Sequence, residues 1–220
     1  MGVQSMTKKQ RYFVAAMLVL ASLSVILFTF QATSEGTPIL DRWASPFVSE
    51  VEGTAVESMF RWITELGSSW FLYTIAIIAG LILWIYYKDS IAGIMLVSGV
   101  AAGYGANFAI KHLVQRERPR ILESVDGTGL SYPSGHAMVS MVTYSLLVYF
   151  LMIQMKSMKA AIWIIALGLI LVLLIGFSRY VLRVHYLTDV IAGFSFGILV
   201  VVVWLSLYHR WKRRRESSPT

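Results

Sequence analysis

The chain has 220 residues, of which 57% are hydrophobic and only 14% charged. Soluble domains usually carry charge on about a quarter of their residues, so this composition indicates an integral membrane protein. The sequence contains no cysteine, which excludes disulfide bonds and thiolate metal sites. The net charge is +7, and its distribution along the chain predicts an orientation in the membrane.

Six apolar stretches are long enough to cross a bilayer, which takes about 20 residues of helix. They cover residues 12–30, 70–87, 91–114, 135–155, 160–179 and 186–208. The sequence therefore predicts an all-α fold, a six-helix transmembrane bundle that forms a single membrane domain over residues 1–210. The first stretch follows basic residues, as in a signal peptide, but its apolar run is longer than usual for one. We expect an uncleaved anchor.

Residues 31–69, between the first two spans, are too polar to cross the membrane. This segment contains several acidic side chains together with Trp43 and Trp62. Trp is enriched at the membrane–water interface, so we expect one or two amphipathic interfacial helices here. Two pairs of glycines four residues apart predict close helix contacts in the third and sixth spans. They are Gly99 with Gly103 and Gly193 with Gly197.

The basic residues predict the orientation of the bundle. With six spans, one side of the membrane holds both termini and two loops, and it carries Lys8, Lys9, Arg11, Lys88, Lys156, Lys159, Arg210, Lys212, Arg213, Arg214 and Arg215. The positive-inside rule places this side in the cytoplasm, with residues 211–220 as a basic cytoplasmic tail. Recognition of acidic lipid or nucleic acid by the tail is the less favoured interpretation, and we expect no nucleic-acid partner. The other eight Lys and Arg lie on the outer side, where an anionic ligand would explain them.

The third span ends in the stretch KHLVQRERPR, which begins at Lys111. Lys111, Gln115 and Arg118 would share one helical face if the helix persisted that far. Pro119 disfavours helix at the residue before it, so we expect the helix to end near Arg118. Such a basic face suits an anion, but a solvated helix end explains it equally well.

The fourth span begins within the stretch SYPSGHAMVS, which starts at Ser131. Ser134 is a natural N-cap, and Gly135 permits close approach of a ligand to the backbone. The unpaired N–H groups and the positive dipole end of a helix start can bind an anion, and His136 stands just inside this start. Taken alone, the stretch fits a simple cap and an interfacial histidine better.

The stretch SRYVLRVHYLTD brings a histidine and an acid to the start of the sixth span. His185 and Asp189 are four residues apart, so Asp189 could accept the Nδ1–H of His185 and leave Nε2 free. An ionisable residue in a membrane helix is a candidate functional residue. The alternative is a local ion pair of Asp189 with Arg179 or Arg183.

All three segments lie at the same predicted end of the bundle. Cations and helix N–H groups suit a phosphate, a carboxylate-backed histidine suits a nucleophile, and a second histidine suits an acid. The chain resembles the type 2 phosphatidic acid phosphatase superfamily in the ordered motifs Lys111-x6-Arg118-Pro119, Pro133-Ser134-Gly135-His136 and Ser178-Arg179-x5-His185-x3-Asp189. This motif core covers residues 111–189. The resemblance is greatest to the small bacterial phosphatases of phosphatidylglycerophosphate and undecaprenyl pyrophosphate.

The resemblance implies a role for each matching residue. His185 would attack phosphorus and form a phosphohistidine, Asp189 would support it, and His136 would protonate the leaving oxygen and then activate water. The phosphoryl oxygens would be held by Lys111, Arg118, Arg179, Ser134 and Gly135. The family needs no metal or other cofactor, since three cations supply what Mg²⁺ often supplies elsewhere.

The resemblance also implies a multi-pass lipid phosphatase of a bacterial-type inner cell membrane, with its active site on the extracytoplasmic side and both termini in the cytoplasm. Its expected partners are membrane lipids, and its expected substrates are lipid phosphates: phosphatidylglycerophosphate, undecaprenyl pyrophosphate or phosphatidic acid. Arg183 and Leu187 flank His185 where many relatives carry Gly and Pro. Arg183 could therefore contact an acidic headgroup or a second phosphate, or simply reach the outer interface.

Three other functions fit parts of the sequence. A lipid phosphotransferase would form the same phosphohistidine but pass the phosphoryl group to another lipid or to a sugar. A transporter or proton relay would need polar residues near the middle of the bilayer, whereas this chain gathers them at one end. A structural membrane protein would leave the spacing of the three motifs unexplained.

Overall fold

The computed structural model describes residues 7–49, 51, 53–119 and 129–217, and the regular structure of these residues is entirely α-helical. In chain order the helices are α1 (Lys8–Thr33), α2 (Ile39–Ser49), α3 (Ala55–Glu65), α4 (Ser69–Ile85), α5 (Ser90–Val114), α6 (Gly135–Met152), α7 (Met158–Val181) and α8 (Leu187–Ser217). The all-α prediction is confirmed for this part of the chain.

Five helices in the described ranges are long and apolar enough to span a membrane, namely α1, α5, α6, α7 and α8. A sixth span results if α3 and α4 count as one, because this pair passes the same test with a bend of 44°. The chain is therefore a multi-pass membrane protein with five or six candidate spans. The polar segment between the first two predicted spans contains two helices, α2 and α3. The last helix runs past the predicted end of its span, so the basic tail continues α8 as far as Ser217.

Short polar residues begin the helices that frame the candidate site. At the start of α6 the Ser134 hydroxyl accepts a hydrogen bond from the Ala137 N–H at 3.4 Å, as predicted for an N-cap. Asp89 caps α5 and Ser157 caps α7 in the same way. Each cap satisfies one of the N–H groups that a helix start leaves unpaired.

The end of α5 differs from the prediction. The helix ends at Val114, and Gln115 takes a left-handed conformation with a φ of 54°. Arg118 therefore lies beyond the helix, and the proposed helical face shared with Lys111 was wrong. The left-handed residue redirects the backbone, so that the chain crosses the end of the bundle and brings Arg118 to the Val184 carbonyl.

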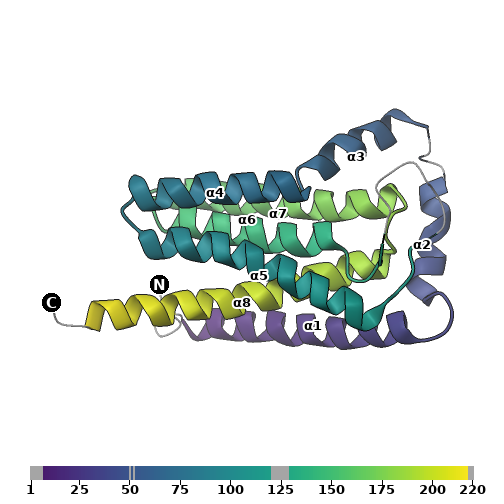
Figure 1. Ribbon diagram of the computed structural model, residues 1–220, viewed down its shortest axis with the longest axis horizontal. Coiled ribbons are helices and arrows are strands. Elements are labelled where there is room, and N and C mark those ends of the chain that lie inside the picture. The colour runs from purple at the N-terminus through teal and green to yellow at the C-terminus, as the bar shows by residue number, and fades with distance from the viewer. Residues whose placement is uncertain (1–6, 50, 52, 120–128, 218–220) are drawn as a thin grey trace.

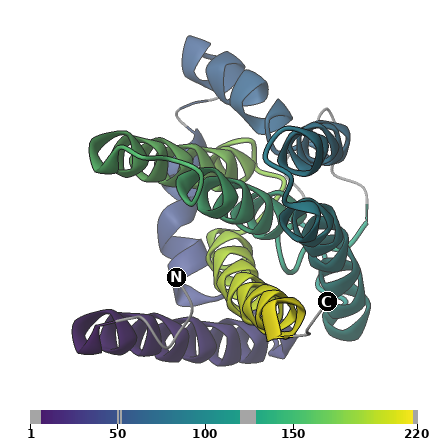
Figure 2. The ribbon, with the colours of Figure 1, turned by 90° about the vertical axis from the view of Figure 1, so that its left-hand side faces the viewer.

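The bundle is built around α6, which contacts α4, α5, α7 and α8, whereas α1 packs mainly against α8 (Figures 1 and 2). Inward side chains of α6, such as Leu146 and Phe150, are fully buried. Many outward side chains of α1 and α7 are apolar and exposed, for example Leu20 and Trp163. Such a surface suits a lipid environment.

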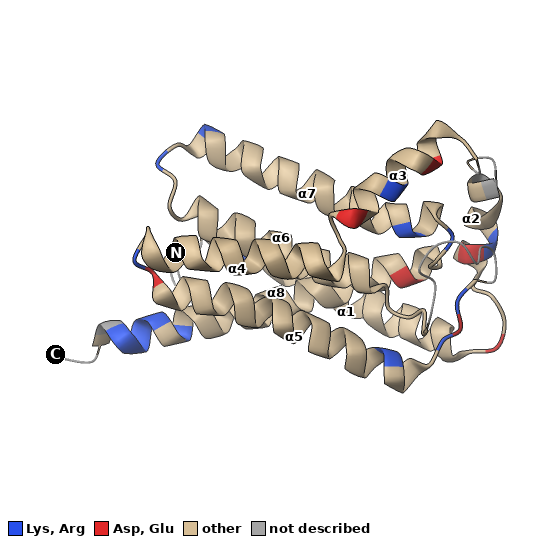
Figure 3. Ribbon diagram, turned by 45° about the horizontal axis from the view of Figure 1, so that its top comes forward, with Lys and Arg blue, Asp and Glu red and all other residues tan. Residues whose placement is uncertain are grey.

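The Lys, Arg, Asp and Glu residues of the described ranges gather toward the two ends of the long helices (Figure 3). The start of α1 and the end of α8 lie at one end, and α2 crosses the opposite end (Figure 1). A transporter or proton relay would need ionisable residues near the bilayer midplane, so the charge distribution disfavours that alternative.

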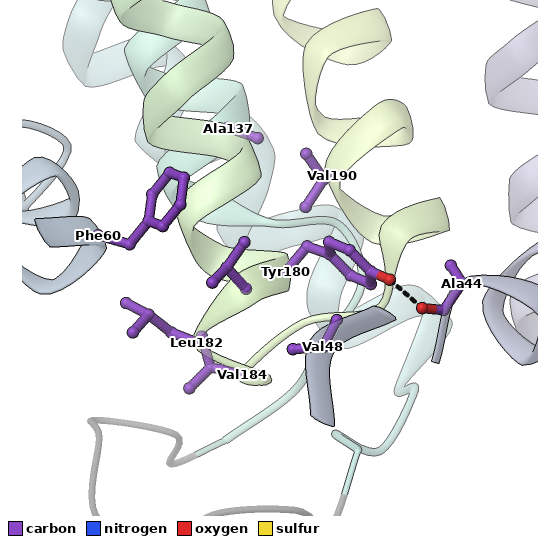
Figure 4. Close-up of a cluster of buried hydrophobic side chains, with 9 residues drawn as sticks. Ala44, Val48, Phe60, Ala137, Tyr180, Leu182, Val184 and Val190 are labelled. Atoms are coloured by element: carbon purple, nitrogen blue, oxygen red, sulfur yellow. Dashed lines mark hydrogen bonds between the residues drawn. The ribbon is translucent and has the colours of Figure 1, made fainter. Parts of the chain in front are cut away.

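A buried apolar cluster fastens α2 to the bundle. Ala44 and Val48 of α2 pack with Tyr180 near the end of α7 and with Val190 of α8 (Figure 4). The Tyr180 hydroxyl also donates a hydrogen bond to the Ala44 carbonyl. As a result α2 covers the C-terminal end of α7 and the N-terminal end of α8, where the third motif lies.

The predicted close contacts are confirmed for Gly99, Gly193 and Gly197, whereas a Cβ atom at Gly103 would lie at an ordinary 3.4 Å from Val142. A Cβ atom at Gly193 would lie 2.8 Å from the Ser134 carbonyl oxygen, and one at Gly197 would lie 2.9 Å from the Met138 carbonyl oxygen. In α5, a Cβ atom at Gly99 would meet Leu146 of α6 at 2.5 Å. Glycine at position 193 therefore allows α8 to approach the N-terminus of α6 closely.

Replacing Gly193 by Ala should destabilise the protein, because the added methyl group meets backbone that cannot move aside like a flexible side chain. Overpacking of this kind costs about 1–3 kcal/mol. Gly105→Ala is the matched control, since a Cβ atom there meets nothing within 4 Å and Ala is the better helix former. Thermal unfolding in detergent should give a lower Tm for Gly193→Ala and an unchanged or higher Tm for Gly105→Ala. Equal Tm values would contradict the close contact.

Candidate active site

The three motif segments meet at the end of the bundle that α2 covers. They are the last turn of α5 with the residues after it, the start of α6, and the end of α7 with the α7–α8 loop and the first turn of α8. Two backbone hydrogen bonds join them. The Ser131 N–H donates to the Arg116 carbonyl at 2.8 Å, and the Ser134 N–H donates to the Asp189 carbonyl at 3.0 Å.

His185 lies in the α7–α8 loop and is buried, with 3% of its surface exposed. Arg118 Nη1 lies 3.3 Å from His185 Nε2 and donates to the Val184 carbonyl at 2.7 Å. Burial lowers the pKa of His185 to about 3, although its hydrogen bond with Asp189 opposes the shift. The imidazole is therefore neutral near pH 7. Because a guanidinium has only donors, the contact with Arg118 places the lone pair on Nε2.

The other ring nitrogen of His185 faces an acceptor pair. Nδ1 lies 3.5 Å from Asp189 Oδ2 and 3.4 Å from Ser131 Oγ. The Ser131 hydroxyl donates its own proton to the same Oδ2, which leaves its lone pairs facing Nδ1. A donor at Nε2 and two acceptors at Nδ1 favour the tautomer with the proton on Nδ1. The four-residue spacing thus places Asp189 beside His185 as expected, with Ser131 sharing the contact.

Asp189 also forms an ion pair with an arginine, as the alternative interpretation of this residue expected. Its partner is Arg116, which was not predicted. Arg116 Nη1 lies 2.6 Å from Asp189 Oδ1. The two carboxylate oxygens therefore have different partners, since Oδ1 binds the arginine and Oδ2 faces His185 and Ser131.

Lys111 and Arg118 both hold the loop before α6. Lys111 Nζ donates to the carbonyls of Leu130 at 2.5 Å and Ser131 at 3.3 Å, and Arg118 Nε donates to the Gly129 carbonyl at 3.1 Å. An ammonium has three N–H donors and a guanidinium five. Each side chain therefore retains donors with which it can bind an anion.

Two further cations stand on and after the last turn of α7. Arg179 is buried and donates from Nη1 to the Thr64 hydroxyl of α3 at 2.9 Å. Arg183 donates to the Val48 carbonyl of α2 at 2.7 Å and has a φ of 58°. Glycine adopts this left-handed conformation most easily, so an arginine at this position carries a conformational cost.

The start of α6 presents His136 to the same region. A Cβ atom at Gly67, between α3 and α4, would lie 3.0 Å from His136 Cδ2, so glycine makes room for the ring. The side chain of Asn107 lies against Gly135 and donates to the Pro133 carbonyl at 3.3 Å. Four charged or titratable neighbours act electrostatically on His136: Arg179, His185, Arg118 and Lys111. The two histidines and three cations thus share one environment.

Two cavities border this environment from different sides. The His185 cavity, of about 550 Å³, lies between α2 and the α7–α8 loop, and its lining includes Arg42, Tyr180, Arg183 and His185. The His136 cavity, of about 250 Å³, lies between the α3–α4 junction, α5 and the start of α6, and its lining includes Gly67, Tyr104, Phe108, Lys111, Gly135 and His136. Each histidine therefore borders its own cavity.

Four polar residues of this region have no predicted role: Asp41, Arg116, Ser131 and Thr188. Arg116, Ser131 and Thr188 lie inside the quoted motif stretches, where their polarity was the available signal. Asp41 contacts Arg116 across 75 positions of the chain, and an acid in an amphipathic helix gives no local sign of such a contact. Within the described ranges, no group of three or more His, Asp or Glu side chains is placed to hold a metal ion.

Comparison with curated proteins places the chain among phosphatases. Phosphatidylglycerophosphatase B of Bacillus subtilis (strain 168) is 33% identical over 157 residues, which are 70% of this chain and 76% of that protein. Dolichyldiphosphatase 1 of Mus musculus is 31% identical over 144 residues, and the match covers 60% of each chain.

Comparison with solved structures extends the similarity to nearly the whole chain. The crystal structure of a transmembrane PAP2 type phosphatidylglycerolphosphate phosphatase from Bacillus subtilis matches with a TM-score of 0.82 at 25% sequence identity. This match covers 89% of the present chain and 98% of the other. The description of the PAP2 superfamily itself matches residues 90–213, which include all three motifs. The chain is therefore a member of the PAP2 superfamily.

Proposed function

We propose that this protein is a metal-independent phosphatase of membrane lipids that works through a phosphohistidine on His185. The arrangement around His185 carries the proposal: a buried neutral imidazole has Nε2 beside Arg118 and Nδ1 beside Asp189. A carboxylate-backed imidazole is a competent nucleophile, and the surrounding cations suit a phosphoryl group. The phosphatase names of the similar proteins support the same reaction class.

In the first step Nε2 of His185 attacks phosphorus in line with the leaving oxygen. The N–P bond forms while the P–O bond to the lipid breaks, and protonated His136 gives its proton to the leaving oxygen. The negative charge of the bound phosphate favours the protonated form of His136. Asp189 stabilises the positive charge that develops on the His185 ring, as the acid of a catalytic triad does.

In the second step water attacks the phosphohistidine from the side that the lipid has left. His136, now neutral, takes a proton from this water while the new O–P bond forms and the N–P bond breaks. Inorganic phosphate is released, His185 returns to its neutral form, and His136 is protonated again. The cycle consumes one water and needs no other reactant.

Three cations and a helix start would bind the phosphoryl oxygens. Lys111, Arg118 and Arg179 come from three separate elements, so they can surround the group. Lys111 uses two of its three donors on loop carbonyls, which leaves one for phosphate. At the start of α6, the Ser134 hydroxyl and the Gly135 N–H add neutral donors.

In-line attack places the lipid on the His136 side of the phosphate, because the leaving oxygen lies opposite His185. The lipid would therefore occupy the His136 cavity, between α5 and the α3–α4 junction. Phe108 of this lining is 65% exposed on the outer surface of the bundle. We infer that the acyl or isoprenyl tail stays in the bilayer while the headgroup reaches the cations laterally.

The names of the similar proteins suggest an order of substrates. Phosphatidylglycerophosphate comes first, because the Bacillus subtilis protein with the higher identity bears its name. A polyprenyl pyrophosphate such as undecaprenyl pyrophosphate follows from the similarity to dolichyldiphosphatase 1. Phosphatidic acid presents the same terminal phosphate to the same cations and is the third candidate.

We place the active site on the extracytoplasmic side of a cell membrane. The opposite end of the bundle holds both termini and the basic residues of the tail, and the positive-inside rule supports a cytoplasmic location for it. Helices α2 and α3 would then lie at the outer interface. Trp43 of α2 and Trp62 of α3 are 81% and 79% exposed, as suits side chains that contact headgroups.

Purified protein should release inorganic phosphate from these lipids in the presence of EDTA and without an acceptor. His185→Ala should abolish release, and His136→Ala should lower it by about 10²–10⁴-fold, the usual contribution of an acid–base group. His209→Ala is the matched control, because His209 hydrogen-bonds to Tyr149 at the far end of the bundle. Wild-type rates in His185→Ala would refute the nucleophile. Transfer to an added lipid or sugar without hydrolysis would identify a phosphotransferase.

The proposed lateral route predicts a preference for membrane-anchored substrate. Lipid phosphate in nanodiscs should be hydrolysed with a higher kcat/KM than a water-soluble ester such as glycerol phosphate. Anchoring raises the local concentration at the site, and we expect an advantage on the order of a hundredfold. Phosphate release from both substrates at matched phosphate concentration measures it. Equal rates in detergent-free conditions would contradict lateral access.

Stability should depend on pH through His185. The folded protein holds the pKa of His185 at about 3, against an ordinary value of 6.5, so between these values the unfolded chain binds the extra proton. The folded state is therefore destabilised as pH falls below about 6.5, by about 2 kcal/mol between pH 7 and pH 5. Denaturant unfolding in detergent should show this loss in wild type and a smaller one in His185→Asn. Parallel pH profiles of the two proteins would refute it.

A further inference from the structure

A buried polar network extends behind the catalytic carboxylate to helix α2. Asp189 Oδ1 binds Arg116 Nη1 at 2.6 Å, and Arg116 Nη2 binds Asp41 Oδ2 at 2.9 Å. Arg116 thus lies between two carboxylates, one on α8 and one on α2. Asp41 stands outside residues 90–213, which are the part of the chain that the superfamily description covers.

Thr188 hydrogen-bonds to both Asp41 and Arg116 in this network. Its N–H and hydroxyl donate to Asp41 Oδ1 and Oδ2 at 3.0 and 2.7 Å, while its Oγ1 accepts from Arg116 Nη1 at 2.8 Å. Asp41, Thr188 and Asp189 are buried, with 5%, 0% and 0% of their surfaces exposed. The Arg116 guanidinium also lies over the Tyr186 ring, 4.0 Å from its centroid. The guanidinium is therefore fixed by both carboxylates, by a hydroxyl and by an aromatic face.

This network orients the carboxylate that serves His185. Arg116 binds Oδ1, the oxygen that faces away from the histidine, and so fixes the rotation of the Asp189 side chain. Oδ2 is thereby held toward His185 Nδ1 and Ser131 Oγ, and it also accepts a hydrogen bond from the Tyr186 N–H at 3.0 Å. Both Nη atoms of Arg116 are engaged by carboxylates, so this arginine differs from the cations that remain able to bind phosphate.

We propose that Arg116 and Asp41 are positioning residues, which hold Asp189 and through it His185 in the reactive arrangement. Helix α2 would thus contribute to catalysis without contacting substrate. The proposal rests on the proposed phosphohistidine mechanism. It assigns a function to two residues that the motifs do not specify. Asp41 lies outside the three motifs, and Arg116 occupies one of the unspecified positions between Lys111 and Arg118.

The test compares Arg116→Gln and Asp41→Asn with wild type in lipid phosphate hydrolysis. Arg116→Gln should lower kcat by about a hundredfold, the effect of a small misplacement of a reacting group, while KM stays near the wild-type value. Asp41→Asn should lower kcat less, by about tenfold, because Arg116 keeps its contact with Asp189. The double variant should be no slower than Arg116→Gln alone, since both changes act through one arginine.

Arg61→Gln is the matched control. It removes the arginine of an exposed ion pair with Glu57 on α3, in the same polar segment as Asp41, and should leave kcat unchanged. His185→Ala in the same assay separates this proposal from the mechanism on which it rests. Loss of activity in His185→Ala together with wild-type kcat in Arg116→Gln would overturn the positioning role alone.

A second readout distinguishes positioning from a merely structural role. Rapid quench with lipid labelled on its phosphate should show slower formation of phosphoenzyme in both variants, at a rate expressed per folded protein. A lower Tm with wild-type phosphorylation per folded protein would overturn the proposal, and so would a raised KM at constant kcat. If Arg116→Gln does not fold, Asp41→Asn decides by the same criteria, because it changes one atom at the edge of the network.

Discussion

The buried carboxylate of Asp189 is the constraint on which the end of the bundle under α2 depends. A charge without solvent exposure must find its partners inside the protein, because an unpaired buried charge is very costly. Asp189 obtains them from three segments: Arg116 after α5, Ser131 before α6, and the Tyr186 N–H in the α7–α8 loop. The three motifs, distant in sequence, therefore meet because each segment supplies a partner to one carboxylate.

The same end of the bundle separates the two sides of the proposed reaction. His185 borders the cavity under α2, whereas His136 borders the cavity that faces α5 and the bend between α3 and α4. In-line displacement needs a nucleophile and an acid on opposite sides of phosphorus. The bundle provides this separation because His136 comes from the start of α6 and His185 from the α7–α8 loop, and the two residues line different cavities. The bend at Gly67 adds the space that the His136 ring occupies.

The sequence predicted those parts of the fold and site that depend on near neighbours in the chain. Apolar runs located the candidate spans, Ser134 caps α6, and the four-residue spacing places Asp189 beside His185. The roles of Asp41 and Arg116 depend on a contact between residues 75 positions apart, for which a single sequence offers no signal. The end of α5 was placed too late, because Pro119 marks a limit for the helix whereas the left-handed Gln115 ends it earlier. The assignment of catalytic roles came from the family signature, since geometry alone identifies neighbours and not the order of events.

Arg183 couples the loop that carries His185 to the helix that covers it. Its left-handed backbone costs roughly 1–2 kcal/mol for a residue other than glycine, while its guanidinium donates to the Val48 carbonyl of α2. The same residue therefore carries the cost of the left-handed backbone and forms a hydrogen bond that attaches the loop to α2. A glycine would relax the backbone but remove the hydrogen bond to Val48, so in this chain the backbone conformation of the loop that carries His185 and one of its contacts with α2 depend on the same residue.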